Sequence, residues 1–356
     1  RYDDYGEEML RITDRQNREM LYGPTNEEQV TEIFRSSIKS YKSLPQLLYH
    51  IQWKFRDEIR PRFGIMRGRE FYMKDAYSFD VSDEDALFSY NKFFLSYLRT
   101  FKRLNLSAIP MAADTGPIGG NLSHEFVILA ETGESKIFTD KRVFEISNDN
   151  IKLEKKSLDE MRKEYEKYYS VTDEKFDKSQ FEKTVSEENR LITKGIEVGH
   201  IFQLGQKYSE KMDVKLKNDQ GDEVTLSMGC YGIGISRIVA AAIEQNYQEM
   251  GMLWPKKITP FQLNIICLDP KKPEVIDASV TLYKLMKKYK IDVVLDDREI
   301  RAGIKFSENE LLGIPYSVVI SPNNFNSNKY EFNDRVLGQK NECTADEIKK
   351  IIELNS

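Results

Sequence analysis

The stretch that decides the fold begins at residue 49 and reads Tyr49-His50-Ile51-Gln52-Trp53-Lys54-Phe55-Arg56. Apolar and polar residues alternate strictly through it, which is the period of a β-strand with one buried face. The pattern predicts that the four apolar side chains face the core and that the polar ones, ending in Arg56, face the other way. A loop rich in arginine and glycine follows at 57–69, and a second strand-like run covers 70–80. We therefore expect an antiparallel hairpin with an arginine-rich tip.

Length and composition place the chain among ordinary globular proteins. It has 356 residues, of which 40% are hydrophobic and 31% charged, enough for a sizeable core and for two or three domains. No apolar run is long enough for a bilayer span, and the polar start lacks the features of a signal peptide. We expect a cytoplasmic protein with no membrane contact. Because the chain opens on Arg1 instead of methionine, it is expected to begin inside a longer polypeptide.

The charge and the cysteines exclude several classes of site. The net charge is −5, so a site for a polyanion must come from a local cluster of basic residues, such as the one at 54–69. The three cysteines lie far apart and form no CxxC pair, which argues against a disulfide framework and against a zinc ribbon. Reduced thiols are expected.

The remainder of the chain shows a change of character at 152–190, which is dense in charge and contains no glycine. Apolar residues recur there at helical spacing, so we expect a short helical insertion. The alternating run 224–230 predicts another strand, which leads through a glycine turn into a helix at 235–245.

Beyond residue 254, two prolines at 255 and 260 mark a linker. Apolar runs at 261–268, 291–295 and 316–320 then predict strands, and 275–290, 305–312 and 345–354 predict helices. This alternation is typical of a small α/β domain. The last helix is expected to start with a capping box formed by Thr344 and Glu347.

Two arginines are candidates for binding phosphate. Arg56 ends a rigid strand, and Arg237 lies in the first turn of the helix that follows the glycine turn. A guanidinium fork binds phosphate oxygens in pairs and stays charged at neutral pH, so the two arginines could clamp a triphosphate; a solvated basic loop is the alternative. The sequence contains no P-loop, dinucleotide fingerprint or GxSxG elbow, which excludes the corresponding nucleotide-binding and hydrolase classes.

Several motifs, taken together, resemble prolyl-tRNA synthetases of the bacterial type. In the first half they are Gly23-Pro24-Thr25-Asn26-Glu27-Glu28, Lys54-Phe55-Arg56-Asp57-Glu58-Ile59-Arg60-Pro61-Arg62-Phe63-Gly64, Arg69-Glu70-Phe71-Tyr72-Met73-Lys74-Asp75-Ala76-Tyr77-Ser78-Phe79 and Ser123-His124-Glu125-Phe126. Further on they are Gly199-His200-Ile201-Phe202-Gln203-Leu204-Gly205, Met228-Gly229-Cys230-Tyr231-Gly232-Ile233-Gly234-Ile235-Ser236-Arg237 and Ala302-Gly303-Ile304-Lys305-Phe306. The family is a group of class II aminoacyl-tRNA synthetases.

The resemblance implies an α+β fold, in which a class II antiparallel-sheet catalytic domain precedes a small α/β anticodon-binding domain. The catalytic domain would comprise 1–130, with motif 2, and 195–254, with motif 3. A reduced, charged helical insertion would occupy 131–194 in place of an editing domain, and 255–356 would bind the anticodon. The implied activity is ATP-dependent formation of prolyl-adenylate and transfer of proline to the 3′ end of its tRNA.

Residue roles follow from the same resemblance. Arg56 is expected to contact the α-phosphate of ATP and the proline carboxylate, and Arg237 the γ-phosphate, with Phe71 stacked on adenine. Arg67 is a further candidate for binding ATP, as a phosphate contact. Glu197 is a candidate partner for ribose or for Mg²⁺, a cation that favours few carboxylates together with phosphate oxygens.

The proline pocket and the anticodon reader are implied in the same way. A small secondary ammonium with an apolar ring needs an anion, a hydrogen-bond acceptor and an apolar wall. The residues expected to supply them are Thr25, Glu27, His200 and Cys230. Asn26 departs from the family pattern, where histidine is expected. In the last domain, Arg298, Lys305 and Glu310 are candidates for reading anticodon bases, with solvated surface charge as the alternative.

Two family traits are missing from this sequence. The segment with motif 1, which builds the dimer interface, is not present, so a homodimer is implied by kinship alone. Residues 131–194 stand where a large editing domain is expected, so we predict no editing of alanyl-tRNA within this chain. The alternative function is a non-catalytic tRNA-binding or regulatory paralogue, which would be expected to lose one of the phosphate contacts; Arg56, Phe71 and Arg237 are all retained.

Overall fold

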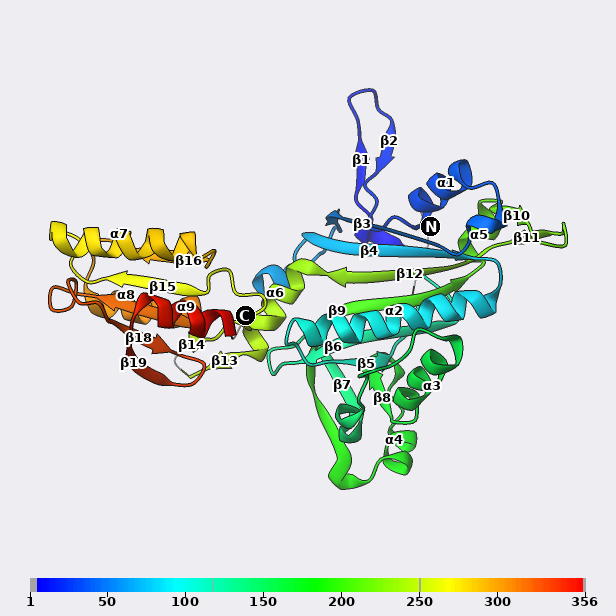
Figure 1. Ribbon diagram of the computed structural model, residues 1–356. Helices are drawn as coiled ribbons and strands as arrows, with labels where there is room; N and C mark the ends of the chain where they lie inside the picture. The colour runs from blue at the N-terminus through cyan, green and yellow to red at the C-terminus, as the bar shows by residue number, and fades with distance from the viewer. Residues whose placement is uncertain (1–4, 117, 250, 355–356) are drawn as a thin grey trace. The chain divides into compact units, whose positions relative to one another are not determined.

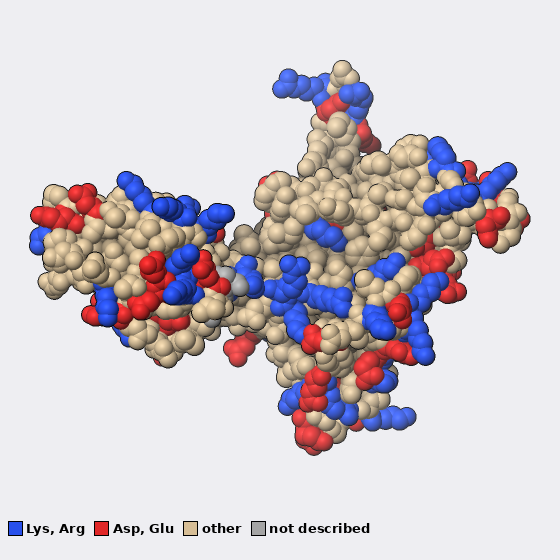
Figure 2. Space-filling model, in the orientation of Figure 1, with Lys and Arg blue, Asp and Glu red and all other residues tan. Residues whose placement is uncertain are grey.

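The computed structural model describes residues 5–116, 118–249 and 251–354. They form two compact units, residues 1–241 and 242–356 (Figure 1). Among the described residues, every helix is too short or too polar to cross a bilayer. In the view of Figure 2, acidic and basic side chains are interspersed over the surface, in keeping with the modest net charge.

Among its described residues, the first unit contains one large sheet, two two-stranded hairpins and six α-helices. Its strands are β1 (Arg11–Thr13), β2 (Glu19–Leu21), β3 (Gln46–Phe55), β4 (Glu70–Asp80), β5 (Ala108–Ala112), β6 (Leu122–Leu129), β7 (Ser135–Asp140), β8 (Ser170–Thr172), β9 (Arg190–Gly205), β10 (Lys215–Lys217), β11 (Glu223–Thr225) and β12 (Ser227–Gly234). Its helices are α1 (Glu27–Ser37), α2 (Asp83–Arg103), α3 (Lys155–Glu166), α4 (Lys178–Thr184), α5 (Lys207–Lys211) and α6 (Ile235–Gln245), the last of which runs into the second unit.

The large sheet has eight strands in the order β3-β4-β12-β9-β6-β5-β8-β7. All of its neighbouring pairs are antiparallel except β5 and β8, as expected for a class II catalytic sheet. The long helix α2 packs on β4, β12, β9 and β5. It starts at Ser82, whose hydroxyl accepts a hydrogen bond from the Asp85 N–H at 3.2 Å. Its buried side chains recur every three or four residues and include Tyr90, Phe94 and Phe101.

The predicted hairpin is present, but the predicted direction of its apolar face is wrong. Strand β3 pairs with β4 in antiparallel register from Gln46 to Phe55. Its polar residues point into the molecule: Lys54 is 1% exposed, whereas Tyr49 is 72% and Trp53 58% exposed. The apolar row lies on the α2 side of the sheet, because Ile51 pairs with Lys74, whose ammonium contacts α2. β3 is the edge strand, and α2 packs over its inner neighbours β4, β12 and β9.

The insertion at 152–190 contains the expected helices, α3 and α4, and also the short strand β8, which the sequence did not reveal. This strand and β7 extend the catalytic sheet, and α3 packs on α2. A small core of Phe138, Phe181 and Val185 holds the segment together. The insertion is therefore built into the catalytic unit, in the lower part of Figure 1.

The second unit is a small α/β domain. Its strands are β13 (Tyr247–Gln248), β14 (Gly251–Met252), β15 (Leu263–Cys267), β16 (Val293–Asp296), β17 (Tyr316–Ile320), β18 (Tyr330–Asp334) and β19 (Gln339–Cys343), and its helices are α7 (Pro273–Lys288), α8 (Ala302–Leu312) and α9 (Ala345–Leu354). Five strands form a sheet in the order β16-β15-β17-β18-β19, parallel in the first three and antiparallel in the rest. The predicted capping box is confirmed: Glu347 accepts from the Thr344 N–H at 2.8 Å, and Thr344 Oγ1 from the Glu347 N–H at 3.3 Å.

One buried carboxyl group makes the stability of the first unit depend on pH. Burial raises the pKa of Asp80 to about 6, although hydrogen bonds from Ser89 and Ser78 oppose the shift. Because the pKa of Asp80 in the folded state lies above the ordinary carboxyl pKa, the free energy of unfolding is largest below the ordinary pKa and falls as pH rises through the folded-state pKa. At about 1.4 kcal/mol per pKa unit, the fall is about 3 kcal/mol. We expect Asp80→Asn to gain stability relative to the wild type between about pH 4 and about pH 8.

Urea unfolding of both proteins at the two pH values measures this difference, with Asp149→Asn as an exposed control. If Asp80→Asn changes the free energy of unfolding by the same amount at both pH values, the raised pKa of Asp80 is contradicted.

Candidate active site

The face of the sheet opposite α2 carries a cavity of about 410 Å³. Strands β4, β9 and β12 form its floor, and the loop that leads into α1 forms part of its wall. All residues predicted for the catalytic unit line this cavity: Thr25, Glu27, Arg56, Arg67, Phe71, Glu197, His200, Cys230 and Arg237. They come from five segments of the sequence, and the fold brings them to one place.

Arg56 stands at the end of β3, at one wall of the cavity. Its backbone N–H donates to the Arg69 carbonyl at 2.8 Å, which continues the hairpin by one residue. Its guanidinium carbon lies 5.3 Å from the centre of the Phe71 ring. Among the described residues, its buried Nε has no hydrogen-bond partner. A buried donor without a partner is unfavourable, so this guanidinium is suited to receiving an anionic ligand.

Arg237 lies in the first turn of α6, where the sequence places it. Its Nη1 donates to the backbone carbonyl and to Oε2 of Glu197, both at 3.0 Å, and its Nε donates to the Met66 carbonyl at 3.0 Å. These contacts connect β9, α6 and the short turn Gly64–Met66 within the motif 2 loop. The arginine is held in an extended position beside a carboxylate, and its planar fork faces the cavity.

A cation could be shared by Glu197 and His200, which line the cavity, and by Glu125 beside them. The nearest ligand atoms of Glu125, Glu197 and His200 all lie within 4.8 Å of one another. Burial raises the pKa of Glu125, and the neighbouring Glu197 carboxylate raises it further. Burial also acts to raise the pKa of Glu197, but the hydrogen bond from His200 and the charge of Arg237 lower it below the usual range. Glu197 is thus the group held ionised, and it fits an oxygen-seeking cation.

The predicted proline pocket is a compact polar corner next to an apolar wall. The Thr25 hydroxyl lies 2.9 and 2.8 Å from the two carboxylate oxygens of Glu27, and both residues are buried. Cys230 is 5% exposed and belongs to the hydrophobic core as well as to the cavity wall. His200 Nε2 lies 2.6 Å from the Ser123 hydroxyl. The buried structural position and the pocket position predicted for Cys230 are therefore compatible.

The motif 2 loop holds its arginines in ion pairs. Arg67 Nε donates to Glu58 at 2.9 Å, and its Nη1 lies 3.8 Å from Glu134. Arg69 pairs with Asp57 at the surface. Arg67 lines the cavity and keeps part of its guanidinium accessible, so it can still reach a phosphate.

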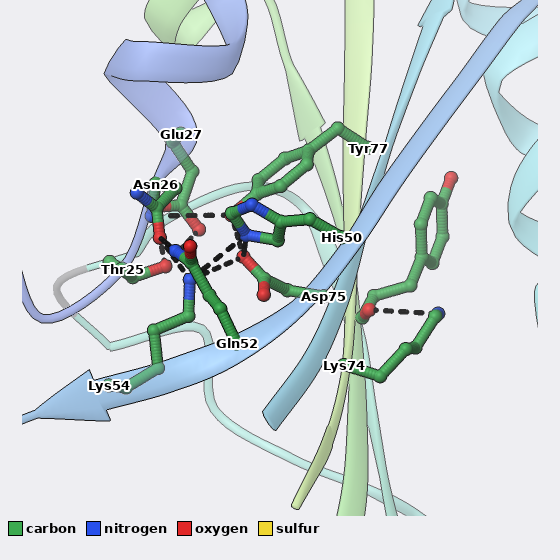
Figure 3. A network of polar contacts seen from close by, with 10 residues as sticks. Thr25, Asn26, Glu27, His50, Gln52, Lys54, Lys74, Asp75 and Tyr77 are labelled. Atoms are coloured by element: carbon green, nitrogen blue, oxygen red, sulfur yellow. Dashed lines mark hydrogen bonds and ion pairs between the residues drawn. The ribbon is translucent and has the colours of Figure 1, made fainter. Parts of the chain in front are cut away.

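Sequence reasoning missed a polar network beside the pocket, which Figure 3 shows. Asp75 and Tyr77 line the cavity, and behind them lie Lys54, His50 and Asn26. Strand periodicity could have revealed the first two, because 71, 73, 75 and 77 share one face of β4. No pattern in the sequence indicates that a lysine of β3 is buried against them.

The three candidates of the second unit lie in different surroundings. Arg298 is half exposed and forms ion pairs with Asp296 and Glu308, each at 2.7 Å. Glu310 is partly buried, and its carboxylate accepts from Arg335 at 2.6 Å. The guanidinium of Arg298 therefore remains accessible to a ligand that competes with Asp296 and Glu308 for its N–H groups.

Lys305 has no exposed surface. Its ammonium donates to the carbonyls of Cys267 at 2.5 Å and Asp296 at 3.2 Å, which end the neighbouring strands β15 and β16. This placement corrects the expectation of a surface side chain at this position. The helical pattern of α8 turns Lys305 toward the sheet, where it satisfies two carbonyls at the strand ends.

The sequence matches two protein families over adjacent parts of the chain. Residues 10–246 match the "tRNA synthetase class II core domain (G, H, P, S and T)", and 262–355 match the "Anticodon binding domain". A proline–tRNA ligase of Pelagibacter ubique is 59% identical over 355 residues, which cover 99% of this chain and 80% of the relative. The chain belongs to the proline–tRNA ligase family. A Bartonella tribocorum proline–tRNA ligase is 53% identical over 98% of this chain and 79% of its own length.

Solved structures agree with the fold of this proline–tRNA ligase family member. A prolyl-tRNA synthetase of Cryptosporidium parvum, complexed with L-proline and AMP, superimposes with a TM-score of 0.71 over 98% of this chain. The sequence identity is 16%, and the chain spans 62% of that protein, so the likeness concerns the fold alone. The predicted family and the predicted fold class, a class II catalytic sheet followed by an anticodon-binding domain, are confirmed.

Proposed function

We propose that this protein activates L-proline with ATP and transfers the prolyl group to the 3′ end of proline tRNA. The observation that carries the proposal is the single cavity, which brings two arginines from separate motifs together with the buried pair Thr25 and Glu27. The first set suits a polyphosphate and the second a small ammonium. Family membership supports joining the two.

In the proposed first step, one carboxylate oxygen of proline attacks the α-phosphorus of ATP. The bond from that phosphorus to its bridging oxygen breaks, and pyrophosphate leaves with the bonding electrons. In the second step the terminal ribose hydroxyl of tRNA attacks the prolyl carbonyl, and AMP leaves as the hydroxyl proton is released. Neither step needs a protein nucleophile, so positioning and charge stabilisation supply the rate.

The proposed roles are those that the family resemblance implies, and the residues that carry them line one cavity. Arg56 would contact the α-phosphate and the proline carboxylate, and Arg237 would contact the γ-phosphate. The Phe71 ring would stack on adenine. Arg67 would add a phosphate contact from the loop. Thr25, Glu27, His200 and Cys230 would surround proline.

We also propose that ATP binds with Mg²⁺. Glu197 would hold the ion because it is the carboxylate kept ionised, and its oxygen lies near a carboxylate oxygen of Glu125 and a ring nitrogen of His200. When bound, Mg²⁺ would offset the negative charge of the phosphates, as it commonly does in enzymes that bind ATP. The residues of the chain would then orient the two substrates and stabilise the charge that develops at the α-phosphate.

ATP–pyrophosphate exchange with a panel of amino acids tests the proposal. Exchange that depends on proline supports activation, and charging of proline tRNA tests the second step. Exchange with another amino acid, or none while ATP still binds, would contradict the assignment. The second outcome would instead favour the non-catalytic tRNA-binding or regulatory paralogue.

The domains of this chain would have separate tasks in charging tRNA. Residues 1–130 and 195–254 would form the catalytic domain around the insertion at 131–194, and 255–356 would bind the anticodon. Arg298 and Glu310 would contact bases there, and buried Lys305 would support the strand ends behind them. The reaction would take place in the cytoplasm, where tRNA is charged.

We propose a homodimer that uses the exposed apolar row of β3. This row consists of Leu47, Tyr49, Ile51 and Trp53, which are 43, 72, 46 and 58% exposed. Figure 2 shows few charged side chains above β3 and β4. An apolar edge of this kind is typical of a covered surface. Light scattering should give twice the chain mass, and Trp53→Glu should shift it toward the monomer; a wild-type monomer at micromolar concentration would contradict the proposal.

We further propose that this chain does not edit alanyl-tRNA. Its insertion is filled by β7, β8, α3 and α4, which pack onto the catalytic unit. Because a missing methylene changes binding by only about 1–3 kcal/mol, the proline pocket should activate alanine at a measurable rate. Purified protein mixed with alanyl-tRNA for proline should leave the ester at its spontaneous hydrolysis rate. Rapid, enzyme-dependent deacylation would overturn this expectation.

A further inference from the structure

The polar network beside the cavity contains one buried carboxylate oxygen that accepts no hydrogen bond from the described residues. Asp75 is 5% exposed and lines the cavity from β4. Its Oδ2 accepts from His50 Nε2 at 2.8 Å, from Lys54 Nζ at 3.0 Å and from the Tyr77 hydroxyl. Its Oδ1 is buried and has no hydrogen-bond partner among the described residues. A buried carboxylate oxygen without a donor is costly and calls for an explanation.

Three donors hold Asp75 in place through the other oxygen. Lys54 is itself almost fully buried, and its ammonium also contacts the side-chain oxygen of Asn26 and His50 Nε2. Tyr77 accepts from the Asn26 backbone N–H at 3.2 Å. Asn26 directly precedes helix α1 and lies between Thr25 and Glu27 (Figure 3). The network therefore ties Asp75 rigidly to the loop that carries the predicted proline-binding pair.

The charged side chains around Asp75 favour a cationic ligand. Two buried carboxylates, Glu27 and Asp75, line the same cavity, and one buried ammonium, that of Lys54, lies beside them. Burial lowers the pKa of Lys54, and the charge of Asp75 opposes that shift. A cationic nitrogen of a ligand next to Asp75 would be favoured here, because buried charges are stable when paired. Arg56, in the wall of the same cavity, is available for the opposite end of a zwitterion.

We propose that Asp75 Oδ1 is a specificity-determining acceptor for the second N–H of the substrate's secondary ammonium, and that Lys54 is the residue that positions it. This inference rests on the proposed function. A protonated pyrrolidine nitrogen has two N–H bonds, and the pair formed by Thr25 and Glu27 offers an acceptor for one of them. Asp75 accepts the other and contributes the charge that favours a cationic ring nitrogen over a neutral atom of the same size.

The test compares proline with tetrahydrofuran-2-carboxylate, which has an ether oxygen in place of the ammonium. Both are measured in ATP–pyrophosphate exchange, proline as substrate and the ether as competitive inhibitor. In Asp75→Asn, we expect the preference for proline over the ether to fall about 10- to 100-fold, as for loss of a hydrogen bond to a charged group. The KM for ATP should stay within about twofold, and Asp149→Asn should match the wild type.

Each outcome decides the proposal. An unchanged preference, or an equal weakening of both ligands, would assign Asp75 a merely structural role and overturn it. Asp75→Ala is the second variant, and loss of ATP binding in both variants would likewise show that the residue supports the sheet. Absence of proline-dependent exchange in the wild type would sink the proposed function instead, so the two failures are distinguishable.

Discussion

Replacing Arg56 with alanine is expected to lower ATP–pyrophosphate exchange by about 10²- to 10³-fold, the usual effect of losing one preorganised donor to a developing charge. The guanidinium stands in the cavity wall over Phe71, and its Nε has no partner among the described residues, so its contacts are available to the substrates. Both kcat and the KM for proline should change, because the same fork would serve the α-phosphate and the proline carboxylate. Arg56→Lys keeps the charge but not the fork and should recover only part of the rate.

Folding of the Arg56 variants should be little affected, since Arg67 and Arg69 form ion pairs that hold the motif 2 loop in the described part of the chain. Arg35→Ala is the matched control: this arginine pairs with Glu32 on the exposed face of α1. Exchange within a few fold of wild type in folded Arg56→Ala would remove Arg56 from the reaction.

The hairpin at the start of the sequence shows what periodicity can and cannot predict. Alternation identified both strands, and β3 and β4 pair as expected. Their facing could not be read from the same pattern, because hydrophobicity reports burial only where another element covers the strand. At the edge strand the pocket buries the polar face, including Lys54, and leaves Trp53 exposed. A functional site is where local rules are expected to fail.

The catalytic residues were predicted more completely than their surroundings. Motif spacing placed every catalytic-unit candidate in one cavity, since motifs keep the residues that touch substrate. Residues behind them act through long-range contacts that single-sequence reasoning does not see. Burial, together with the Glu197 carboxylate from another strand, raises the pKa of Glu125, and Asp75 is held by Lys54 from the neighbouring strand.

In the second unit, hydrophobic runs revealed the three parallel strands but not the two that follow. β19 consists of Gln339–Cys343 and is exposed along most of its length, so it carries no apolar signal. It forms through backbone pairing with β18. Lys305 illustrates the converse, because a charged residue type conceals a fully buried position. Both cases depend on partners distant in sequence.

Arg237→Ala is expected to lower kcat/KM for ATP by about 10²- to 10³-fold while changing the KM for proline much less. The guanidinium belongs to α6 and would contact the γ-phosphate, away from the reacting carboxylate. Its loss also removes the charge that, with the His200 hydrogen bond, keeps the pKa of Glu197 low. Exchange in the variant should therefore fall more steeply than in the wild type as pH is lowered, because protonated Glu197 is a poor ligand for Mg²⁺.

Arg237→Lys separates these two effects. A lysine can restore charge beside Glu197, and so the shallow pH profile, but it cannot reproduce the three contacts that the planar fork makes with Glu197 and Met66. We expect the pH dependence to recover and the KM for ATP to remain raised. Equal losses for ATP and proline in Arg237→Ala, with an unchanged pH profile, would show that Arg237 only braces α6 against β9 and does not bind the nucleotide.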